Sequence, residues 1–448
     1  MIPDSKGQGG GKMRANGRMV LFTAAALAVL AVFLTCGASP ARADVVPGDV
    51  IDKSNWQKAQ DLLPAPVLEW VKKGDFSLQV GKLNYEMKEY FPPYVQESLR
   101  ANLGKYDVNE KDMIVDKATG KVPGYIEGVP FPEIDLADPK AATKILHNRE
   151  LGLLFNVGNC VYHPYCQWVG KGGLERELGA LYINAPMSGN PQAKDRSNTE
   201  GILRYTIIAV IKPYDVAGFA MMLWRYQDDR QDMNLSYLPA IRRVRRMSPA
   251  NRSDSFVGSD FCIDDPYGYD GKVTAFSWKM LRKQEGLVPF VSPDPEKIQL
   301  NAQGEWETRM PRTAPVYGYE KPELGLAAWA PTNFIWVKRP VYVIEALSRD
   351  PYYNYGKMEV WADAENYGIV YKVIYDRAGL YWKTFYAGFG GVESDDGKTR
   401  FLIVRIQNIV DDRTQHASVI ANHVDPEYFG ANLSMDDFTL AGFQKYCK

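Results

Sequence analysis

A series of apolar segments in the second half of the chain constrains the fold more than any other feature. Apolar and polar residues alternate in some of them, and both faces are apolar in others, as in β-strands. Turn-forming residues separate them, because Asp363 to Tyr367, Asp376 to Gly379 and Asp395 to Gly397 contain the glycines and asparagines that tight hairpins favour. This spacing predicts one large, curved, antiparallel β-sheet. The segments are Val341 to Leu347, Lys357 to Asp363, Gly368 to Asp376, Leu380 to Phe389, Arg400 to Val410 and Ala417 to Asn422.

The same pattern extends into the first half of the chain. Arg204 to Ile211 and Phe219 to Tyr226 are apolar runs bounded by glycine, proline and an aspartate-rich turn, and Leu181 to Asn184 precedes them. Such spacing is typical of a β-meander. We therefore expect a mainly β protein with some helices (α+β), in which helices and loops cover the sheet.

Composition divides the chain into parts. Residues 1–43 have the features of a signal peptide, residues 44–150 contain short helical and extended segments, and residues 151–448 contain the predicted sheet. Within the last part, residues 267–335 are rich in glycine and proline, so we expect irregular loops around short strands there. We expect residues 44–150 to pack on the main unit as an N-terminal extension.

The first 43 residues predict export to the periplasm. Basic residues precede an apolar run from Met19 to Leu34, and Ala41 to Ala43 form a small-x-small cleavage site. The mature chain would then begin near Asp44. Because the apolar run is shorter than about 20 residues, we expect no permanent membrane span. A lipoprotein alternative at Cys36 stays open, although Thr35 stands where lipidation requires a small residue.

Composition also narrows the kind of partner. Aromatic residues make up 12% of the chain, a supply suited to strands and to the lining of an apolar pocket. The formal net charge is −1, so the chain lacks the strongly basic balance of nucleic-acid-binding proteins. We expect no nucleic-acid partner.

The cysteines after the predicted cleavage site would lie in a compartment that favours oxidation. Cys160 and Cys166 enclose a short loop, and we expect a disulfide between them. The alternative is a metal site made by Cys160, His163 and Cys166, but it lacks a fourth ligand and a recognised zinc spacing, so we expect no metal. Cys262 and Cys447 either pair or stay free.

The most charged stretch covers residues 237–265. Alternate arginines in it fall on opposite faces of one expected strand. One interpretation is a network of ion pairs that fixes a covering loop, in which Asp254 or Asp260 pairs with Arg243 or Arg245. The other is a docking patch beside a cavity. The residues assigned to this network are Arg242, Arg243, Arg245, Arg246, Arg252, Asp254 and Asp260.

The sequence contains no catalytic or nucleotide-binding motif that we recognise. The carboxylate pairs Asp264-Asp265 and Asp411-Asp412 are adjacent, so their side chains would point to opposite faces of a strand instead of flanking one substrate bond. A lone histidine such as His416 or His423 is more often a polar residue at the rim of a sheet than a ligand. We expect no enzyme and no cofactor.

Several runs of this sequence resemble one family. They are similar to periplasmic outer-membrane lipoprotein-sorting-like proteins, whose fold is that of the Lol lipoprotein carriers, and especially to a large branch known as a domain of unknown function. The likeness covers about residues 64 to 443, and the chain differs from the small carriers in its length and its proline-rich insertion. The runs are Gly128 to Asn148, Tyr237 to Asp265, Val341 to Glu345 and Tyr355 to Lys357.

This resemblance implies an unclosed, strongly curved antiparallel β-barrel, covered by helices and enclosing an apolar cavity for acyl chains. It also implies a link with envelope transporters of the resistance-nodulation type and with an outer-membrane protein. The expected function is a periplasmic binding or shuttle protein for a lipid or another hydrophobic molecule. One alternative is a structural or adaptor subunit of an envelope complex. A second is a hydrolase acting on a hydrophobic or glycan substrate.

A curved sheet with covering segments turns one face of each strand inward, and alternate residues share that face. Applying this rule to the strands at 219–226, 341–347, 368–376 and 380–389 gives the expected lining of the cavity. The residues are Phe219, Met221, Leu223, Val341, Val343, Tyr371, Val373, Trp382 and Tyr386.

Overall fold

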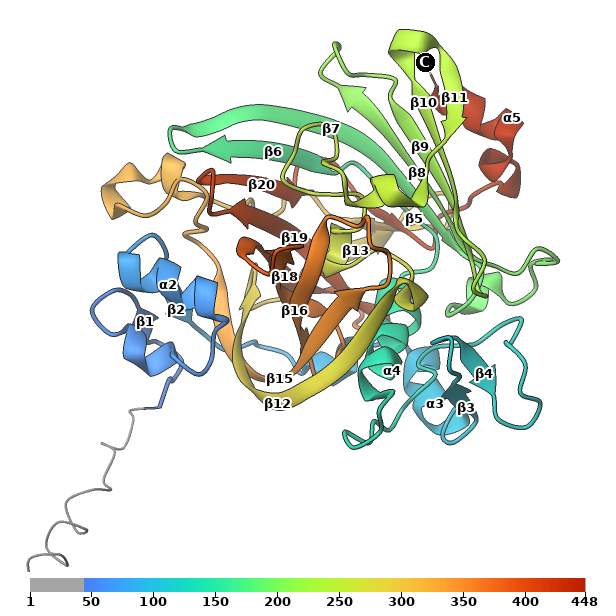
Figure 1. Cartoon of the computed structure of the whole chain (residues 1–448), viewed down its shortest axis with the longest axis horizontal. Coiled ribbons are helices and arrows are strands. Elements are labelled where there is room, and N and C mark those ends of the chain that lie inside the picture. The colour runs from blue at the N-terminus through green and yellow to red at the C-terminus, as the bar shows by residue number, and fades with distance from the viewer. Residues whose placement is uncertain (1–43, 448) are drawn as a thin grey trace, which may run out of the picture. The chain divides into compact units, whose positions relative to one another are not determined.

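Antiparallel strand pairs build most of the computed structural model, which describes residues 44–447 (Figure 1). The main strands follow one another across the sheet in the order β11, β10, β9, β8, β7, β6, β20, β19, β18, β17, β16, β15, β12. Within the described residues β11 pairs with β10, β12 pairs with β15 and β18, and no pairing joins β11 to β12, so the sheet is unclosed. The predicted fold class, a mainly β protein with one large, curved, unclosed antiparallel sheet, is confirmed.

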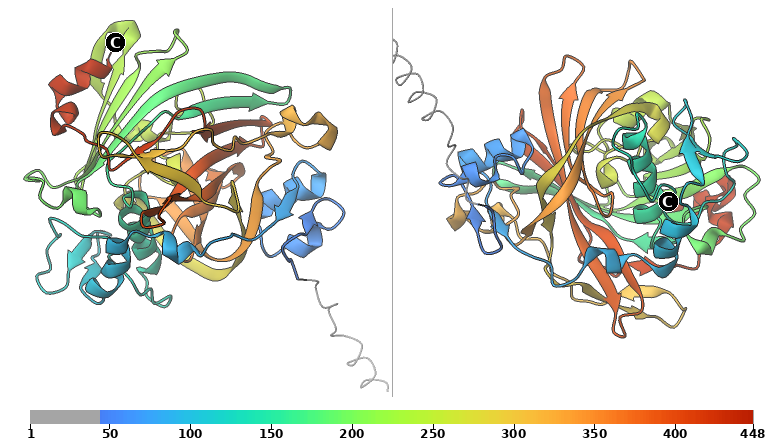
Figure 2. Two further views of the ribbon diagram at one scale, coloured as in Figure 1. Left: turned by 180° about the vertical axis from the view of Figure 1, so that it is seen from behind. Right: turned by 90° about the horizontal axis from the view of Figure 1, so that it is seen from below.

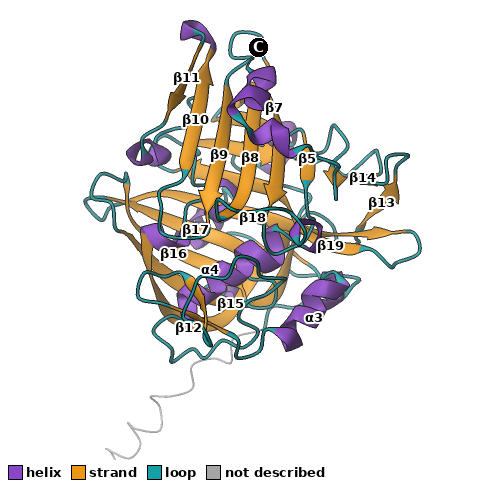
Figure 3. Cartoon of the chain, turned by 90° about the vertical axis from the view of Figure 1, so that its right-hand side faces the viewer, coloured by secondary structure: helices purple, strands orange, loops and turns teal. Residues whose placement is uncertain are grey.

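The strands from residue 160 to residue 246 form what we call the N-terminal half-sheet. Figure 3 shows β7 to β11 side by side at one end of the sheet. The bounds are β5 Cys160–Tyr162, β6 Tyr165–Gly170, β7 Gly173–Pro186, β8 Ile202–Lys212, β9 Ala220–Tyr226, β10 Met233–Leu238 and β11 Arg243–Arg246.

The expected disulfide between Cys160 and Cys166 is wrong, because both cysteines are free thiols. The strands β5 and β6 do not form a hairpin but lie end to end along β7. Cys160 is opposite Asn184 and Cys166 is opposite Leu178. Six residues of extended strand separate these two positions by roughly 20 Å. A disulfide requires Cα atoms within about 7 Å.

The strands after residue 275 form the C-terminal half-sheet. Its main strands are β12, β15 to β20, and the short strands β13, β14 and β21 lie at its side. The bounds are β12 Phe276–Phe290, β13 Glu296–Leu300, β14 Trp306–Thr308, β15 Ile335–Ser348, β16 Tyr355–Asp363, β17 Ile369–Asp376, β18 Tyr381–Ser394, β19 Arg400–Asp411, β20 His416–Ala421 and β21 Tyr428–Phe429.

The segment expected to be irregular, residues 267–335, differs from the expectation at its start. It contains β12, a strand of 15 residues that pairs along its length with β15. Gly286 and Pro289 concealed this strand in the sequence. Proline is tolerated there because β12 is a margin of the sheet, where one side of the backbone needs no partner.

Helices of the N-terminal region pack beside the sheet, whereas its short strand β2 pairs with β15 and carries β1 on its other side, so this region and the sheet form one compact unit. The helix α2 follows Pro64 and ends at Gly74, whose φ of 85° suits glycine at a helix end. The bounds are β1 Val50–Ile51, α2 Ala65–Lys73, β2 Leu78–Val80, α3 Pro93–Ala101, β3 Tyr106–Val108, β4 Ile114–Asp116 and α4 Ala141–Asn148, which continues as a π-helical turn, η3 Arg149–Leu154. The C-terminal helical segment comprises η11 Met435–Phe438, α5 Leu440–Phe443 and η12 Gln444–Tyr446.

The C-terminal half-sheet is covered on both faces. Figures 1 and 2 show α2 and α4 on opposite sides of its strands. On the α2 side, Trp70 and Phe76 lie against Tyr386 of β18, with ring centroids 6.3 and 5.8 Å away. The indole of Trp70 also donates a hydrogen bond to Asp412 over 2.9 Å. The predicted export signal, residues 1–43, lies outside the described residues.

Candidate ligand cavity

The chain between the two margins of the sheet, residues 247–275, crosses its interior, and we call it the connecting segment. It links β11 to β12 and is anchored on the C-terminal half-sheet by Asp265. The Asp265 carboxylate lies 2.5 Å from Nζ of Lys372 on β17, and both side chains are buried. The hydroxyl of Tyr355 on β16 donates to the same carboxylate over 2.8 Å. Burial raises the pKa of Asp265, but Lys372 and the amide of Cys262 outweigh it and leave this pKa below its ordinary value.

A second anchor of the connecting segment is Asp260. Its carboxylate lies 2.6 Å from Nδ1 of His416 on β20 and accepts a hydrogen bond from Ser418 over 2.7 Å. Lys383 of β18 donates to the backbone carbonyl of Asp260 over 2.8 Å. The hydrogen bond with Asp260 raises the pKa of His416.

Asp260, His416 and Ser418 are the residue types of a hydrolytic triad, but they are not arranged as one. The serine hydroxyl donates to the carboxylate and not to the imidazole. A triad requires the base to accept the proton of the nucleophile, with the acid on the other ring nitrogen. This cluster fixes the connecting segment and provides no activated nucleophile.

The opposite side of the connecting segment faces the N-terminal half-sheet across an apolar cavity of about 90 Å³. Strands β5 to β9 supply one wall, the connecting segment supplies the other, and β19 and β20 close one end. Aliphatic and aromatic side chains dominate both walls. The lining residues are Tyr162, Pro164, Cys166, Leu178, Ala180, Tyr182, Ile208, Met221, Phe256, Ser259, Phe261, Cys262, Ile263, Pro266, Tyr267, Gln407 and Ile420.

A second cavity, of about 70 Å³, lies directly beside the first. The two share Tyr162, Pro164, Tyr267, Gln407 and Ile420 in their linings. Tyr267 belongs to the connecting segment and has a φ of 57°, in the left-handed region that is unfavourable for a tyrosine. Its backbone N–H donates to the side chain of Gln407. The two cavities therefore meet at this shared group of side chains.

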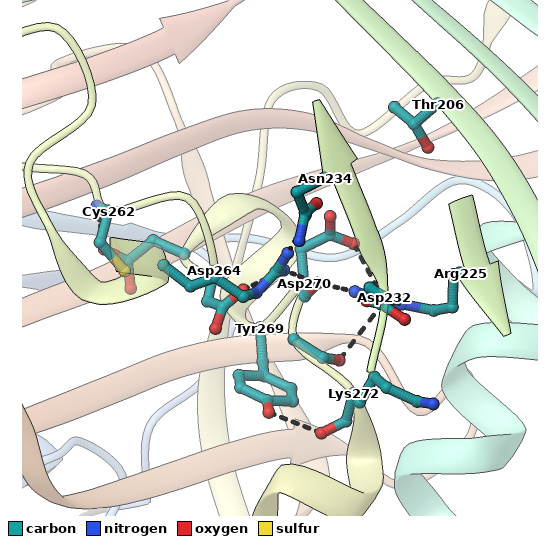
Figure 4. A network of polar contacts seen from close by, with 12 residues as sticks. Thr206, Arg225, Asp232, Asn234, Cys262, Asp264, Tyr269, Asp270 and Lys272 are labelled. Atoms are coloured by element: carbon teal, nitrogen blue, oxygen red, sulfur yellow. Dashed lines mark hydrogen bonds and ion pairs between the residues drawn. The ribbon is translucent and has the colours of Figure 1, made fainter. Parts of the chain in front are cut away.

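The unclosed margin of the sheet is occupied by a buried polar network (Figure 4). Arg225 of β9 lies 3.1 Å from Asp232, and Arg204 of β8 lies 2.6 Å from Asp270 of the connecting segment. Burial raises the pKa of Asp270, but the two arginines outweigh it and hold this pKa below its ordinary value. Arg252 pairs with Asp264, both in the connecting segment. The network ties the connecting segment to β8 and β9.

A polar cleft of about 510 Å³ lies beside this network. Asp232, Asn234, Arg252, Asp264 and Lys272 are among its lining residues. The charged groups of the network already form ion pairs with one another, which leaves less of their charge available to a ligand. The apolar cavity is therefore the better candidate for a binding site.

The predicted lining residues divide between two places. Met221 of β9 lines the apolar cavity, and Phe219, directly before this strand, packs on Phe256, whose side chain lines it. Leu223 of β9 is buried but is not among the residues that line the cavity. The others lie in the C-terminal half-sheet, away from the cavity. They are Val341, Val343, Tyr371, Val373 and Tyr386, which are buried, and Trp382, which packs on Tyr355.

The residues that sequence reasoning missed are those of β7 and of the connecting segment. Leu178, Ala180 and Tyr182 alternate on β7, but the charged run at residues 175–177 hid the start of this strand. Phe256, Phe261 and other apolar residues of the connecting segment stand among acids and serines. Their apolar spacing within a polar loop was the available signal.

The predicted arginine network is also divided. Arg242, Arg243, Arg245 and Arg246 are exposed, and Asp260 pairs with His416 rather than with any of them. The side chain of Asp254 accepts hydrogen bonds from Asn251 and Asn354. The expected pairs fail because β11 is a margin of the sheet, whereas the connecting segment turns inward after it. Only Arg252 enters the buried network.

In residues 44–447 no helix is long and apolar enough to cross a membrane. The same residues contain no group of three histidine, cysteine or acidic side chains placed to hold a metal ion. Cys160 and Cys166, two ligands of the alternative metal site, lie far apart because β5 and β6 follow one another along β7.

These features define a class of proteins in which an unclosed antiparallel sheet and a connecting segment enclose an apolar cavity. The chain belongs to the family described as "Protein of unknown function (DUF1329)", whose model matches residues 50–437. The resemblance to that branch is confirmed. No curated protein matches the chain.

Several solved structures are similar to this chain. A domain from Vibrio parahaemolyticus, described as an outer membrane lipoprotein-sorting protein domain, is 17% identical with a TM-score of 0.46, over 69% of this chain and 100% of that one. A DUF1329 family protein from Desulfovibrio piger is 16% identical with a TM-score of 0.44, over 68% and 99%. A LolA superfamily protein from Nitrosomonas europaea is 13% identical with a TM-score of 0.40, over 67% and 98%.

Proposed function

We propose that this protein is a periplasmic carrier that binds a lipid or another hydrophobic molecule and performs no catalysis. The observation behind this proposal is the apolar cavity between the N-terminal half-sheet and the connecting segment. Pockets that bind small molecules are concave, mostly apolar and provided with few polar groups. The cavity fits this description, since Gln407 and Ser259 are the uncharged polar side chains among its lining residues, beside three tyrosines and two thiols.

The described structure is a closed form of this carrier. A cavity of about 90 Å³ is smaller than an engineered cavity of about 150 Å³ that holds benzene. A lipid chain therefore needs Tyr267 and its neighbours to move, which would join the two cavities. The left-handed φ of Tyr267 favours such a movement, because it costs conformational energy in the closed form.

The location and the partners belong to the same proposal. The features of residues 1–43 favour export to the periplasm, with the mature chain beginning near Asp44. The family resemblance suggests a resistance-nodulation-type transporter and an outer-membrane protein as partners, with association at the outer membrane.

The small size of the cavities favours a second candidate function, a structural or adaptor subunit without a ligand.

Ligand binding can be tested by filling the cavity. Ile208 of β8 lines it, whereas Ile211 on the same strand is 48% exposed. We expect Ile208→Trp to fold and to lose most of the affinity of the wild-type protein for a fluorescent fatty-acid analogue, while Ile211→Trp keeps it. Tyr267→Gly should bind the analogue more tightly, because glycine accepts the left-handed φ and the missing ring joins the cavities.

The decisive measurement is titration of the analogue, together with native mass spectrometry of protein purified from its own envelope. A copurified hydrophobic molecule, lost in Ile208→Trp, supports the carrier. If the wild-type protein binds no analogue and carries no copurified molecule, the carrier function is refuted and the adaptor function is supported.

A further inference from the structure

The β10–β11 hairpin lies at one margin of the sheet and carries a cluster of exposed arginines. Its strands pair in the register Leu238 opposite Arg243 and Leu235 opposite Arg246, and a short turn, η5 Pro239–Ile241, joins them. Within the described residues the register of β11 is with β10 alone. Every side chain from residue 241 to residue 246 is exposed. The hairpin thus presents a free margin of the sheet to its surroundings (Figure 3).

No residue of the described part of the chain neutralises the charge of this hairpin. Residues 233–253 contain five arginines and no acidic residue. Arg252 is buried against Asp264, but the other four make no side-chain hydrogen bond or ion pair with any residue that the structure describes. These four are Arg242, Arg243, Arg245 and Arg246. An anionic partner outside the chain could form ion pairs with these four arginines.

Exposed apolar side chains stand among these arginines. Leu238, Ile241 and Val244 are 36%, 42% and 36% exposed. The hairpin residues 235–247 line neither apolar cavity nor the polar cleft. A pocketless element that combines cations with apolar side chains is typical of segments that lie at the surface of an anionic bilayer, where the cations meet phosphates and the apolar groups enter the interface. An acidic protein partner would use the charges but gives no equivalent role to the scattered apolar residues.

We propose that the β10–β11 hairpin docks this protein on the surface of a bilayer that contains anionic phospholipids. The binding is independent of whether the cavity holds a ligand. It would bring the unclosed margin of the sheet to the membrane, because Asn234 of β10 lines the polar cleft at that margin.

Vesicle flotation tests this proposal with the mature protein. We expect binding to vesicles of phosphatidylcholine with phosphatidylglycerol, little binding to phosphatidylcholine alone, and release by salt, because exposed charges are screened. Each arginine near an anionic surface increases the affinity for the membrane about fivefold. The triple variant Arg243→Gln, Arg245→Gln and Arg246→Gln should therefore bind roughly a hundredfold more weakly.

The opposite margin of the sheet supplies a matched control. Strand β12 carries Lys279, Arg282 and Lys283, all exposed, and replacing these three by glutamine removes the same charge. We expect this control to keep the binding of the wild-type protein. The variant Ile241→Ser with Val244→Ser keeps all charges and should lose a smaller part of the binding, which is the part that resists salt.

Two outcomes overturn the proposal. One is equal binding to both kinds of vesicle, or to neither, by the wild-type protein, as expected if the hairpin serves a protein partner. The other is equal loss in the β11 and β12 variants, which would mean attraction by general charge. Titration of the fatty-acid analogue, unchanged in the β11 variant, keeps this result separate from the function of the cavity.

Discussion

The two half-sheets differ in what covers them. The N-terminal half-sheet buries one face under the C-terminal helical segment, where Ile183, Ile207 and Phe443 pack together, and turns its other face to the apolar cavity. The C-terminal half-sheet is covered on both faces, by aromatic side chains around Trp70 and by the anchors of the connecting segment. The connecting segment therefore meets the C-terminal half-sheet through direct polar contacts, whereas the apolar cavity separates it from the N-terminal half-sheet.

This difference separates stability from binding in the molecule. The anchors Asp260 and Asp265 fix one side of the connecting segment to the C-terminal half-sheet through charged and hydrogen-bonded contacts. Its other side meets the N-terminal half-sheet through apolar contacts around a space. Removal of an anchor should therefore lower stability, whereas changes across the cavity should mainly alter what it binds.

The largest effect is expected at the buried pair of Asp265 and Lys372. Asp265→Asn leaves the Lys372 ammonium buried without a counter-charge, which should lower the free energy of unfolding by about 3 to 5 kcal/mol. Unfolding by denaturant measures this loss of unfolding free energy. Asp229→Asn is the matched control, because its partner Lys111 is exposed, and this change should cost less than about 1 kcal/mol.

A double variant, Asp265→Asn with Lys372→Met, removes the unpaired charge and should recover much of the loss. If Asp265→Asn unfolds no more easily than Asp229→Asn, the connecting segment is not anchored there, and the contrast between the half-sheets fails.

A second prediction compares overpacking in the two half-sheets. Val373 is 1% exposed and lies opposite Glu359 and Thr384 in the doubly covered half. Val373→Trp should lower the free energy of unfolding by about 1 to 3 kcal/mol or more, because no space receives the ring. Ile208→Trp should cost less, since the cavity accepts the added atoms. Equal losses in thermal or denaturant unfolding would show that the cavity offers no usable space.

The same contrast explains what the sequence could predict. Strands such as β16 to β19 were found because their apolar runs and turns are local signals. The faces of these strands could not be assigned, because both are covered and both are apolar. Tyr371 and Tyr386 lie directly opposite each other, as their shared face requires, yet that face meets Trp70 and Phe76 instead of the cavity.

The connecting segment could not be placed from the sequence for a different reason. Its partners, Lys372, Gln407 and His416, lie more than a hundred residues away, and no local pattern relates such distant positions. The four arginines were recognised as unusual, but whether they pair depends on β11 being a margin of the sheet. The family resemblance supplied the unclosed sheet, which periodicity alone does not distinguish from a closed one.

The smallest effect is expected at His416 and depends on pH. Asp260 raises the pKa of His416 above its ordinary value of 6.5, so its contribution to stability is complete below that value and is lost as the pH rises through the raised pKa. Glu175 also faces this imidazole, and Lys383 donates to the carbonyl of Asp260. We expect the melting temperature of the wild-type protein to exceed that of His416→Gln most at about pH 5.5, and the excess to shrink towards about pH 8.5.

His423→Gln is the control with the opposite trend, since burial and Arg312 lower the pKa of His423. An excess for His416 that grows with pH would mean that the imidazole is held neutral, and that Asp260 does not fix the connecting segment through an ion pair.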